Sequence, residues 1–288
     1  MNLFDQLVNE ALKNNKELSL LRLVVEKELL HHDILRILSE AALLEHLTFI
    51  GGTCLRMCYG AKRLSEDLDF TGGADFSRES LSDMAHLLAS TIKTKYDFVV
   101  KVKEPIRETG NVDTWTLQVQ TREDRKDIPA QRINIDICAI PSYQKQPMFL
   151  INHYEVEMGT GGLILQAQTL EEIFADKLLA FALRPNRIKH RDLWDIFWLH
   201  HKKINPALDL IPLKVNDHHR KEKEFLLLFE QRMQSVKTDP KIAQEFQYEM
   251  QRFISDDINA KYAAADPHFF QALGSLIELY YNKLIQVF

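Results

Sequence analysis

The spacing of apolar residues divides the chain into a mixed first half and a helical second half. Between residues 19 and 47, Leu, Ile and Val recur at three- and four-residue intervals, which predicts a helix. Short apolar runs at 47–50 and 68–70 lead into pairs of glycines and predict strands that end in turns. Two further helices are predicted at 53–60, where Gly60 closes the helix, and at 80–93.

Three longer strands are predicted in the region that follows. Residues 96–102, 115–121 and 132–140 are rich in β-branched and aromatic side chains. The last of these alternates strictly, so that Ile133, Ile135 and Ile137 share one face and Asn134, Asp136 and Cys138 share the other. This block therefore favours a sheet with one buried and one polar face.

From Thr169 onward the pattern is almost entirely helical. Thr169 and Glu172 form a capping box at the start of the first helix, and residues 221–288 predict three more helices. The character changes between about residues 142 and 168. We therefore expect an α+β protein, with an α/β domain built on a mixed sheet at 1–150 and an all-helical domain at 160–288.

Composition narrows the class of protein. The 288 residues are 45% apolar with a net charge of −5, and no run of 18 apolar residues predicts a membrane span. The N-terminal residues lack the features of a signal peptide and the three cysteines give no disulfide framework, so we expect a cytoplasmic protein without membrane partners. The basic stretch 184–191 is either a solvated loop or a local nucleic-acid-binding patch.

The densest chemical signal is a glycine turn followed by two aspartates. Gly51, Gly52 and Thr53 join a strand to a helix, an arrangement in which the backbone can approach a phosphate closely. Strand alternation puts Asp67 and Asp69 on one face, and Asp136 adds a third carboxylate if its strand joins the same sheet. Such carboxylates suit Mg²⁺ in phosphoryl or nucleotidyl transfer, whereas the alternative is a surface turn with two solvated aspartates.

The helical half carries a second signal. Lys177 falls within the apolar stripe of its helix, where it must either extend to solvent or meet an anion such as a triphosphate. Asp192 shares a helix face with apolar residues, and Asp195 lies four residues after Arg191, as in an ordinary helix ion pair. The aromatic residues around Trp194 are typical of a core, with base stacking as the alternative.

The string from Gly51 to Asp69 resembles the polymerase-β-like nucleotidyltransferase superfamily. Within it, the pattern Arg63-x-Ser65-x-Asp67-x-Asp69-Phe resembles the AbiEii/AbiGii toxins of bacterial toxin–antitoxin and phage-abortive-infection systems. The resemblance implies a nucleotide-binding turn and a metal site, and Lys177 as a second nucleotide contact. The residues are Gly51, Gly52, Thr53, Arg63 and Ser65 for the nucleotide and Asp67, Asp69 and Asp136 for the metal. Asp192, which follows the lysine-bearing helix in a matching signature, would have a catalytic or organising role in a cleft between the two halves.

These features lead to a functional hypothesis with alternatives. We expect a Mg²⁺-dependent enzyme, with Mn²⁺ as a substitute, that moves a nucleoside monophosphate from a nucleoside triphosphate to an acceptor and releases pyrophosphate. The resemblance implies an RNA acceptor, such as the 3′ end of a tRNA, and a toxin neutralised by a cognate antitoxin. The alternatives are transfer to a small molecule or a protein hydroxyl, or a nucleotide-binding module without catalysis. The base preference, the acceptor and the oligomeric state stay open.

Overall fold

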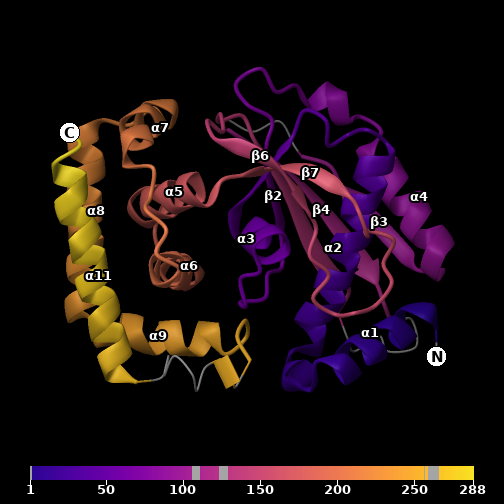
Figure 1. The fold of residues 1–288 in the computed structure, drawn as a ribbon. Helices are drawn as coiled ribbons and strands as arrows, with labels where there is room; N and C mark the ends of the chain where they lie inside the picture. The colour runs from indigo at the N-terminus through magenta and orange to yellow at the C-terminus, as the bar shows by residue number, and fades with distance from the viewer. Residues whose placement is uncertain (1, 106–110, 123–128, 256, 259–265) are drawn as a thin grey trace. The chain divides into compact units, whose positions relative to one another are not determined.

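The computed structural model describes residues 2–105, 111–122, 129–255, 257–258 and 266–288. The chain divides into two compact units, one that ends at Gln168 and one that begins at Thr169. We describe each unit by itself; Figure 1 shows the course of the chain through both.

The first unit is built on a seven-stranded mixed sheet in the order β3-β4-β5-β2-β1-β7-β6. The pairs β2–β5 and β1–β7 are parallel, and the other four pairs are antiparallel. The strands are β1 (Thr48–Ile50), β2 (Leu68–Thr71), β3 (Val99–Lys103), β4 (Val112–Gln120), β5 (Gln131–Cys138), β6 (Lys145–Phe149) and β7 (Ile164–Gln168).

Helices α2 and α4 pack on each other and on the sheet. They cover the face that carries the alternating isoleucines of β5, all of which are buried, together with Leu68 and Phe70 of β2. The helices of this unit are α1 (Leu3–Asn14), α2 (Arg22–Glu40), α3 (Gly51–Tyr59) and α4 (Met84–Tyr96), with short 3₁₀ turns at Lys16–Leu21 and Arg78–Leu81. The other face of β5 carries Asn134, Asp136 and Cys138, which are half-buried.

The helices and strands predicted for this unit are present as helices and strands, but their first and last residues differ from the prediction. The helix expected at 19–47 is α2, which ends at Glu40 because Ala42 adopts a positive φ of 59° and breaks the helical path. The strand expected from residue 96 begins only at Val99, because α4 runs on to Tyr96 and Asp97 ends it with a left-handed conformation.

The sheet also contains two strands that the sequence did not predict. β6 and β7 pair antiparallel within the stretch where the sequence changes character, and β7 joins the sheet beside β1. Pro147 lies in β6, which is an edge strand. Proline is tolerated there because an edge strand leaves every second backbone N–H without a partner strand. The first unit therefore extends to Gln168.

The described residues of the second unit form helices joined by loops. Its helices are α5 (Leu170–Leu183), α6 (His190–His201), α7 (Ile211–Asp217), α8 (Glu222–Thr238), α9 (Pro240–Met250) and α11 (Pro267–Ile285), with a 3₁₀ turn at Leu208–Leu210. The predicted cap is present, since the side chain of Thr169 accepts a hydrogen bond from the Glu172 N–H at 3.3 Å. Trp194 and Trp198 are buried, which confirms them as core residues. Within the described ranges, no helix is both long and apolar enough to cross a membrane.

The three cysteines occupy two environments. Cys54 and Cys58 are buried in α3, whereas Cys138 is half-buried on the polar face of β5, two residues beyond Asp136. Burial raises the pKa of the Cys54 thiol well above its usual value, and the nearby Cys58 adds to the effect. Cys54 is therefore a packing residue in its ordinary protonated form.

Candidate active site

Of the three predicted aspartates of the first unit, Asp69 and Asp136 lie on one face of the adjacent strands β2 and β5, and Asp67 immediately precedes β2. The parallel register of β2 and β5 sets Asp69 directly opposite Asp136. Asp67 accepts a hydrogen bond from the backbone N–H of Asn134 at 3.1 Å, and Asp136 accepts one from the Thr114 hydroxyl at 2.6 Å. All three aspartates are half-buried, so the polar face of the sheet gathers carboxylates that solvent can reach.

The glycine turn lies beside the same carboxylates. β1 pairs antiparallel with β2, so that Ile50 faces Asp69, and α3 begins immediately afterwards at Gly51. Gly51 has a φ of +77°, and a Cβ there would stand 2.6 Å from Oδ2 of Asp69. A Cβ on Gly52 would stand 2.4 Å from Nη2 of Arg63. The position of Gly51 therefore favours glycine, which brings the backbone at the start of α3 close to the Asp69 carboxylate, whereas a side chain at Gly52 would require Arg63 to move.

Thr53, Arg63 and Ser65 lie beneath this turn. All three are buried. Thr53 donates a hydrogen bond to the backbone carbonyl of Asp67, and its Oγ1 is 2.7 Å from Oγ of Ser65. Arg63 donates to the backbone carbonyl of Leu64 at 2.8 Å. The arrangement ties the start of α3 to the segment that leads into the acidic strand.

A buried glutamate that the sequence did not single out joins the same segments. Glu28 of α2 accepts hydrogen bonds from Nε of Arg56 at 3.0 Å, from the Ser65 backbone N–H at 2.8 Å and from the Tyr154 hydroxyl. Burial opposes ionisation of Glu28, but Arg56 and the two hydrogen bonds outweigh it, so the pKa lies below its usual value. Glu28 and Arg56 are 28 residues apart, and no local pattern relates them.

In the second unit, Lys177 meets an anion, as its buried position requires. The anions are two aspartates of the same unit, since Nζ of Lys177 lies 2.7 Å from Asp192 and 2.8 Å from Asp195. Arg184 also lies 3.1 Å from Asp192. Burial opposes ionisation of Asp192, but the charges of Lys177, Lys189 and Arg184 lower its pKa below the usual range. Asp195, for which the sequence suggested an ordinary ion pair with Arg191, belongs to this cluster. The signal was its i, i+3 spacing from Asp192, which puts both carboxylates on one helix face.

The basic stretch 184–191 is folded against its own unit. Arg191 lies 3.3 Å from Glu249 and its guanidinium is 4.4 Å from the Phe253 ring. Arg232 of α8 donates to the backbone carbonyls of Phe181, Arg184 and Arg187 and so fixes the loop between α5 and α6. The guanidinium of Arg191 is therefore engaged in contacts within the second unit.

The carboxylate set of the first unit is compatible with a hard divalent cation. Within the described part of the chain, no group of three or more His, Cys, Asp or Glu side chains could by itself hold a metal ion. Magnesium does not need such a group, because it commonly binds one or two carboxylates and completes its octahedron with phosphate oxygens and water. Asp69, beside the glycine turn, and Asp67, just before β2, offer that partial set.

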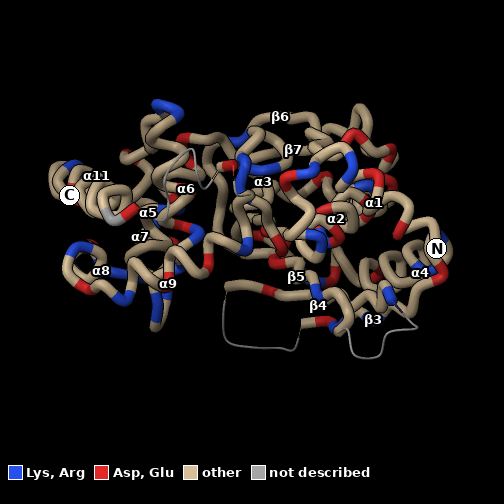
Figure 2. Tube along the Cα trace, turned by 90° about the horizontal axis from the view of Figure 1, so that it is seen from below, with Lys and Arg blue, Asp and Glu red and all other residues tan. Residues whose placement is uncertain are grey.

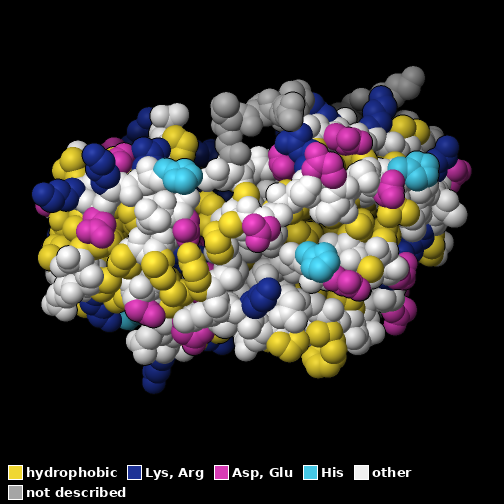
Figure 3. Space-filling model, turned by 90° about the horizontal axis from the view of Figure 1, so that it is seen from above, with side chains coloured by type: hydrophobic (Ala, Val, Ile, Leu, Met, Phe, Trp, Pro, Cys, Tyr) yellow, Lys and Arg dark blue, Asp and Glu magenta, His cyan; other side chains and the backbone are white. Residues whose placement is uncertain are grey.

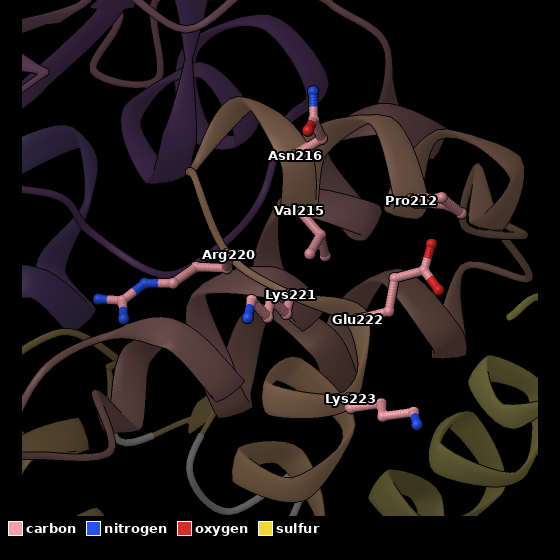
Figure 4. A pocket seen from close by; sticks show the side chains of 7 residues that line it. All are labelled: Pro212, Val215, Asn216, Arg220, Lys221, Glu222 and Lys223. Atoms are coloured by element: carbon pink, nitrogen blue, oxygen red, sulfur yellow. The ribbon is translucent and has the colours of Figure 1, made fainter.

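A cavity of 340 Å³ in the second unit lies beside the start of α8. Its charged side chains extend in different directions (Figure 4), and Arg220 pairs with Glu224 at 2.9 Å. The residues that line it are Pro212, Val215, Asn216, Arg220, Lys221, Glu222 and Lys223. Because these groups do not converge, the cavity is not the candidate site.

Comparison with known protein families identifies the family of the chain. The family model of the nucleotidyl transferase AbiEii toxins, of type IV toxin–antitoxin systems, matches residues 33–275. The chain belongs to this family. The AbiEii match runs through both units, from α2 to α11, and contains every residue of the candidate site except Glu28. The protein is therefore a nucleotidyltransferase, and its family is one in which a toxin is paired with an antitoxin.

Two solved structures from Helicobacter pylori are similar to this AbiEii-family chain. The first, JHP933, is 18% identical, and the similarity covers 91% of this chain and 94% of that one with a TM-score of 0.43. The second, which is described as a proposed nucleotidyltransferase, is 17% identical over 92% of this chain and 97% of that one, with a TM-score of 0.46. No curated protein sequence matches the chain. The assignment rests on the family model.

Proposed function

We propose that the protein transfers a nucleoside monophosphate from a nucleoside triphosphate to the 3′ hydroxyl of an RNA, with Mg²⁺ held by Asp67 and Asp69. The observation that supports this most strongly is the position of the half-buried Asp69 carboxylate directly beside the glycine turn, with half-buried Asp67 two residues before it. When bound, Mg²⁺ supplies positive charge at the triphosphate and at the leaving pyrophosphate. Manganese takes the same oxygen ligands and is the expected substitute.

The turn at Gly51 and Gly52 is the proposed triphosphate site. The first backbone N–H groups of a helix have no partner within the helix, and the helix dipole gives this end a partial positive charge. The N-cap of α3, Ile50, makes no side-chain cap that would occupy them. Phosphate oxygens are suitable acceptors for these donors.

Asp136 is the proposed acceptor of the proton from the incoming hydroxyl. The Thr114 hydroxyl fixes one of its oxygens at 2.6 Å, which leaves the carboxylate oriented on the polar face beside Asp69. Lys177 remains the proposed phosphate-binding cation, oriented by Asp192 and Asp195. Each of these roles is a proposal for mutagenesis.

For the cellular role we propose a cytoplasmic toxin that modifies RNA, such as the 3′ end of a tRNA, and that a cognate antitoxin counteracts. Family membership supports the toxin and the antitoxin. Expression of the chain alone should therefore arrest bacterial growth, and co-expression of the antitoxin should restore it. Normal growth at verified expression would contradict this role.

The test of the activity is label transfer from each α-phosphate-labelled nucleoside triphosphate to total bacterial RNA in the presence of Mg²⁺. The Asp67→Asn/Asp69→Asn variant and a reaction with chelator are the controls. We expect a labelled RNA band that both controls abolish and that identifies the nucleotide. Label in the protein or small-molecule fraction would refute the RNA acceptor, and nucleotide binding without transfer to any fraction would refute the proposal.

A further inference from the structure

The polar face of the sheet in the first unit carries more than the aspartates. Its residues form transverse rows, of which the first, Asp69–Asp136–Thr114, contains two of the candidate carboxylates. The register places Asn134, Thr116 and Lys103 in the next row. The row beyond it consists of Arg132, Gln118 and Lys101. One sheet face therefore changes from acidic to basic within three rows.

The three cations of these rows are exposed and have no charged partner. Lys101, Lys103 and Arg132 form neither an ion pair nor a side-chain hydrogen bond with any described residue. In contrast, Lys95 lies 2.6 Å from Asp33, and Arg56 is held by Glu28 at 3.0 Å. Figure 2, which views the structure from below, shows basic segments beside the labels of β3 and β4 and acidic ones beside β5.

The carboxylates lie between the glycine turn and these cations. In the strand order β3-β4-β5-β2-β1, the turn follows β1, the aspartates are on β2 and β5, and the lysines are on β3. Arg132 precedes Asp136 by four residues on β5, which corresponds to about 13 Å, and β3 lies about 10 Å sideways from β5. The cations are thus too far from the carboxylates to contact a triphosphate bound at the turn.

We propose that Lys101, Lys103 and Arg132 bind the backbone phosphates of the single-stranded 3′ end of the acceptor RNA. This inference rests on the proposed transfer to RNA. A nucleic-acid strand that presents its 3′ hydroxyl at Asp136 and runs toward β3 brings its phosphates over the cations. At about 3.4 Å per stacked nucleotide, Arg132 meets the backbone roughly four nucleotides from the 3′ end. Unpaired surface cations are the usual contacts for phosphates, and they fix the register of the strand without reading its sequence.

The three cations form a local basic area and are not part of a generally basic surface. The chain has a net charge of −5, so a general attraction for polyanions is absent. The face seen from above in Figure 3 carries acidic, basic and apolar side chains intermixed. The proposed contact is instead a local basic area on the face that already carries the carboxylates.

The test compares two triple variants of equal charge change. Lys101→Gln/Lys103→Gln/Arg132→Gln removes the proposed surface. Its control, Lys13→Gln/Lys16→Gln/Lys145→Gln, removes three exposed lysines of the same unit that also have no partner among the described residues. The probe is a 12-nucleotide single-stranded RNA with a free 3′ hydroxyl, measured by anisotropy across a salt series and as acceptor in label transfer.

We expect the first variant to raise the KM for this RNA at least tenfold, with the KM for the nucleoside triphosphate within twofold of wild type. The slope of log Kd against log salt should fall by about 2, since each lost contact with single-stranded nucleic acid removes about 0.7. The control variant should match the wild type in both measurements. Equal behaviour of the two variants would overturn the inference. A wild-type protein that transfers no nucleotide to RNA would instead refute the proposed function, so the two failures are distinguishable.

Discussion

The carboxylates of the two units differ in how their charge is compensated. Asp67, Asp69 and Asp136 are half-buried on a strand face and accept hydrogen bonds from neutral donors such as the Asn134 N–H and the Thr114 hydroxyl. Asp192 and Asp195 are buried, and both lie within 3 Å of Lys177. The second set is neutralised by the chain itself, whereas the first is arranged for a ligand. Substitutions in the first set should therefore affect mainly activity, whereas those in the second should affect stability together with the orientation of Lys177.

The largest expected effect is that of Asp69→Asn on activity. Loss of one carboxylate from the proposed metal site should reduce nucleotide transfer by about a thousandfold, equivalent to about 4 kcal/mol. The free energy of unfolding should stay within about 0.5 kcal/mol of wild type or rise, because one of two nearby like charges is removed. Label transfer and urea denaturation measure the two quantities. Activity within tenfold of wild type would contradict the assignment of Asp69.

The next effect is that of Asp192→Asn on stability. A buried ion pair that loses one partner costs about 3 kcal/mol, even though Asp195 still faces Lys177. Urea denaturation of the wild type and the variant at neutral pH measures this difference. An unchanged midpoint would show that the cluster does not stabilise the second unit.

The same aspartate makes a prediction about pH. The folded-state pKa of Asp192 is depressed, so its contribution to stability is present above the unfolded value of about 3.9 and is lost as the pH falls below it. The advantage of the wild type over Asp192→Asn should therefore begin to fall as the pH drops below about 4 and should keep falling toward the depressed folded-state pKa. The difference between the two denaturation midpoints at each pH provides the measurement.

A matched pair of glutamates sharpens the comparison within the first unit. Glu26 and Glu28 are both buried on α2 and both pair with arginines, but Glu28 holds Arg56 and the Ser65 N–H, whereas Glu26 holds Arg22 and Arg122. Glu28→Gln and Glu26→Gln should each cost about 2 kcal/mol. Only Glu28→Gln should also lower kcat, since Ser65 belongs to the segment that leads into the acidic strand. An equal change in kcat for both variants would reduce Glu28 to a general stabilising residue.

A smaller loss of stability than in the two glutamate variants is expected for Gly51→Ala. A φ of +77° disfavours alanine by about 1 kcal/mol, and the new Cβ would displace the Asp69 carboxylate, 2.6 Å away. We expect a modest fall in Tm but a clear rise in the Mg²⁺ concentration required for half-maximal transfer. Gly73→Ala is the control, because that glycine also has a positive φ and has no atom within 4 Å of its Cβ position. A normal Mg²⁺ requirement in Gly51→Ala would contradict the proposed metal position.

The sequence predicted what local periodicity determines. Alternation identified the buried isoleucines of β5 and the polar face of Asp136, and helical spacing identified Lys177 as a lysine that must either extend to solvent or meet an anion. It did not identify that anion as Asp192 and Asp195, because the lysine and its partners are on different helices. The ion pairs of Glu28 with Arg56 and of Lys214 with Glu172, at 2.6 Å, were not predicted for the same reason. The strand β6 was not predicted because Lys145, Gln146 and Pro147 are exposed at a sheet edge and carry no apolar alternation.

The unequal environments of the cysteines offer a reporter built into the native chain. A thiol reacts as its thiolate, so Cys54, buried with a raised pKa, should react slowly with maleimides and Cys58, buried beside it, should be poorly accessible. Cys138 is more accessible, and it shares the strand face of Asp136. A fluorophore attached there would stand two residues from the candidate carboxylate, and its emission could follow nucleotide and acceptor binding in real time without an engineered label site.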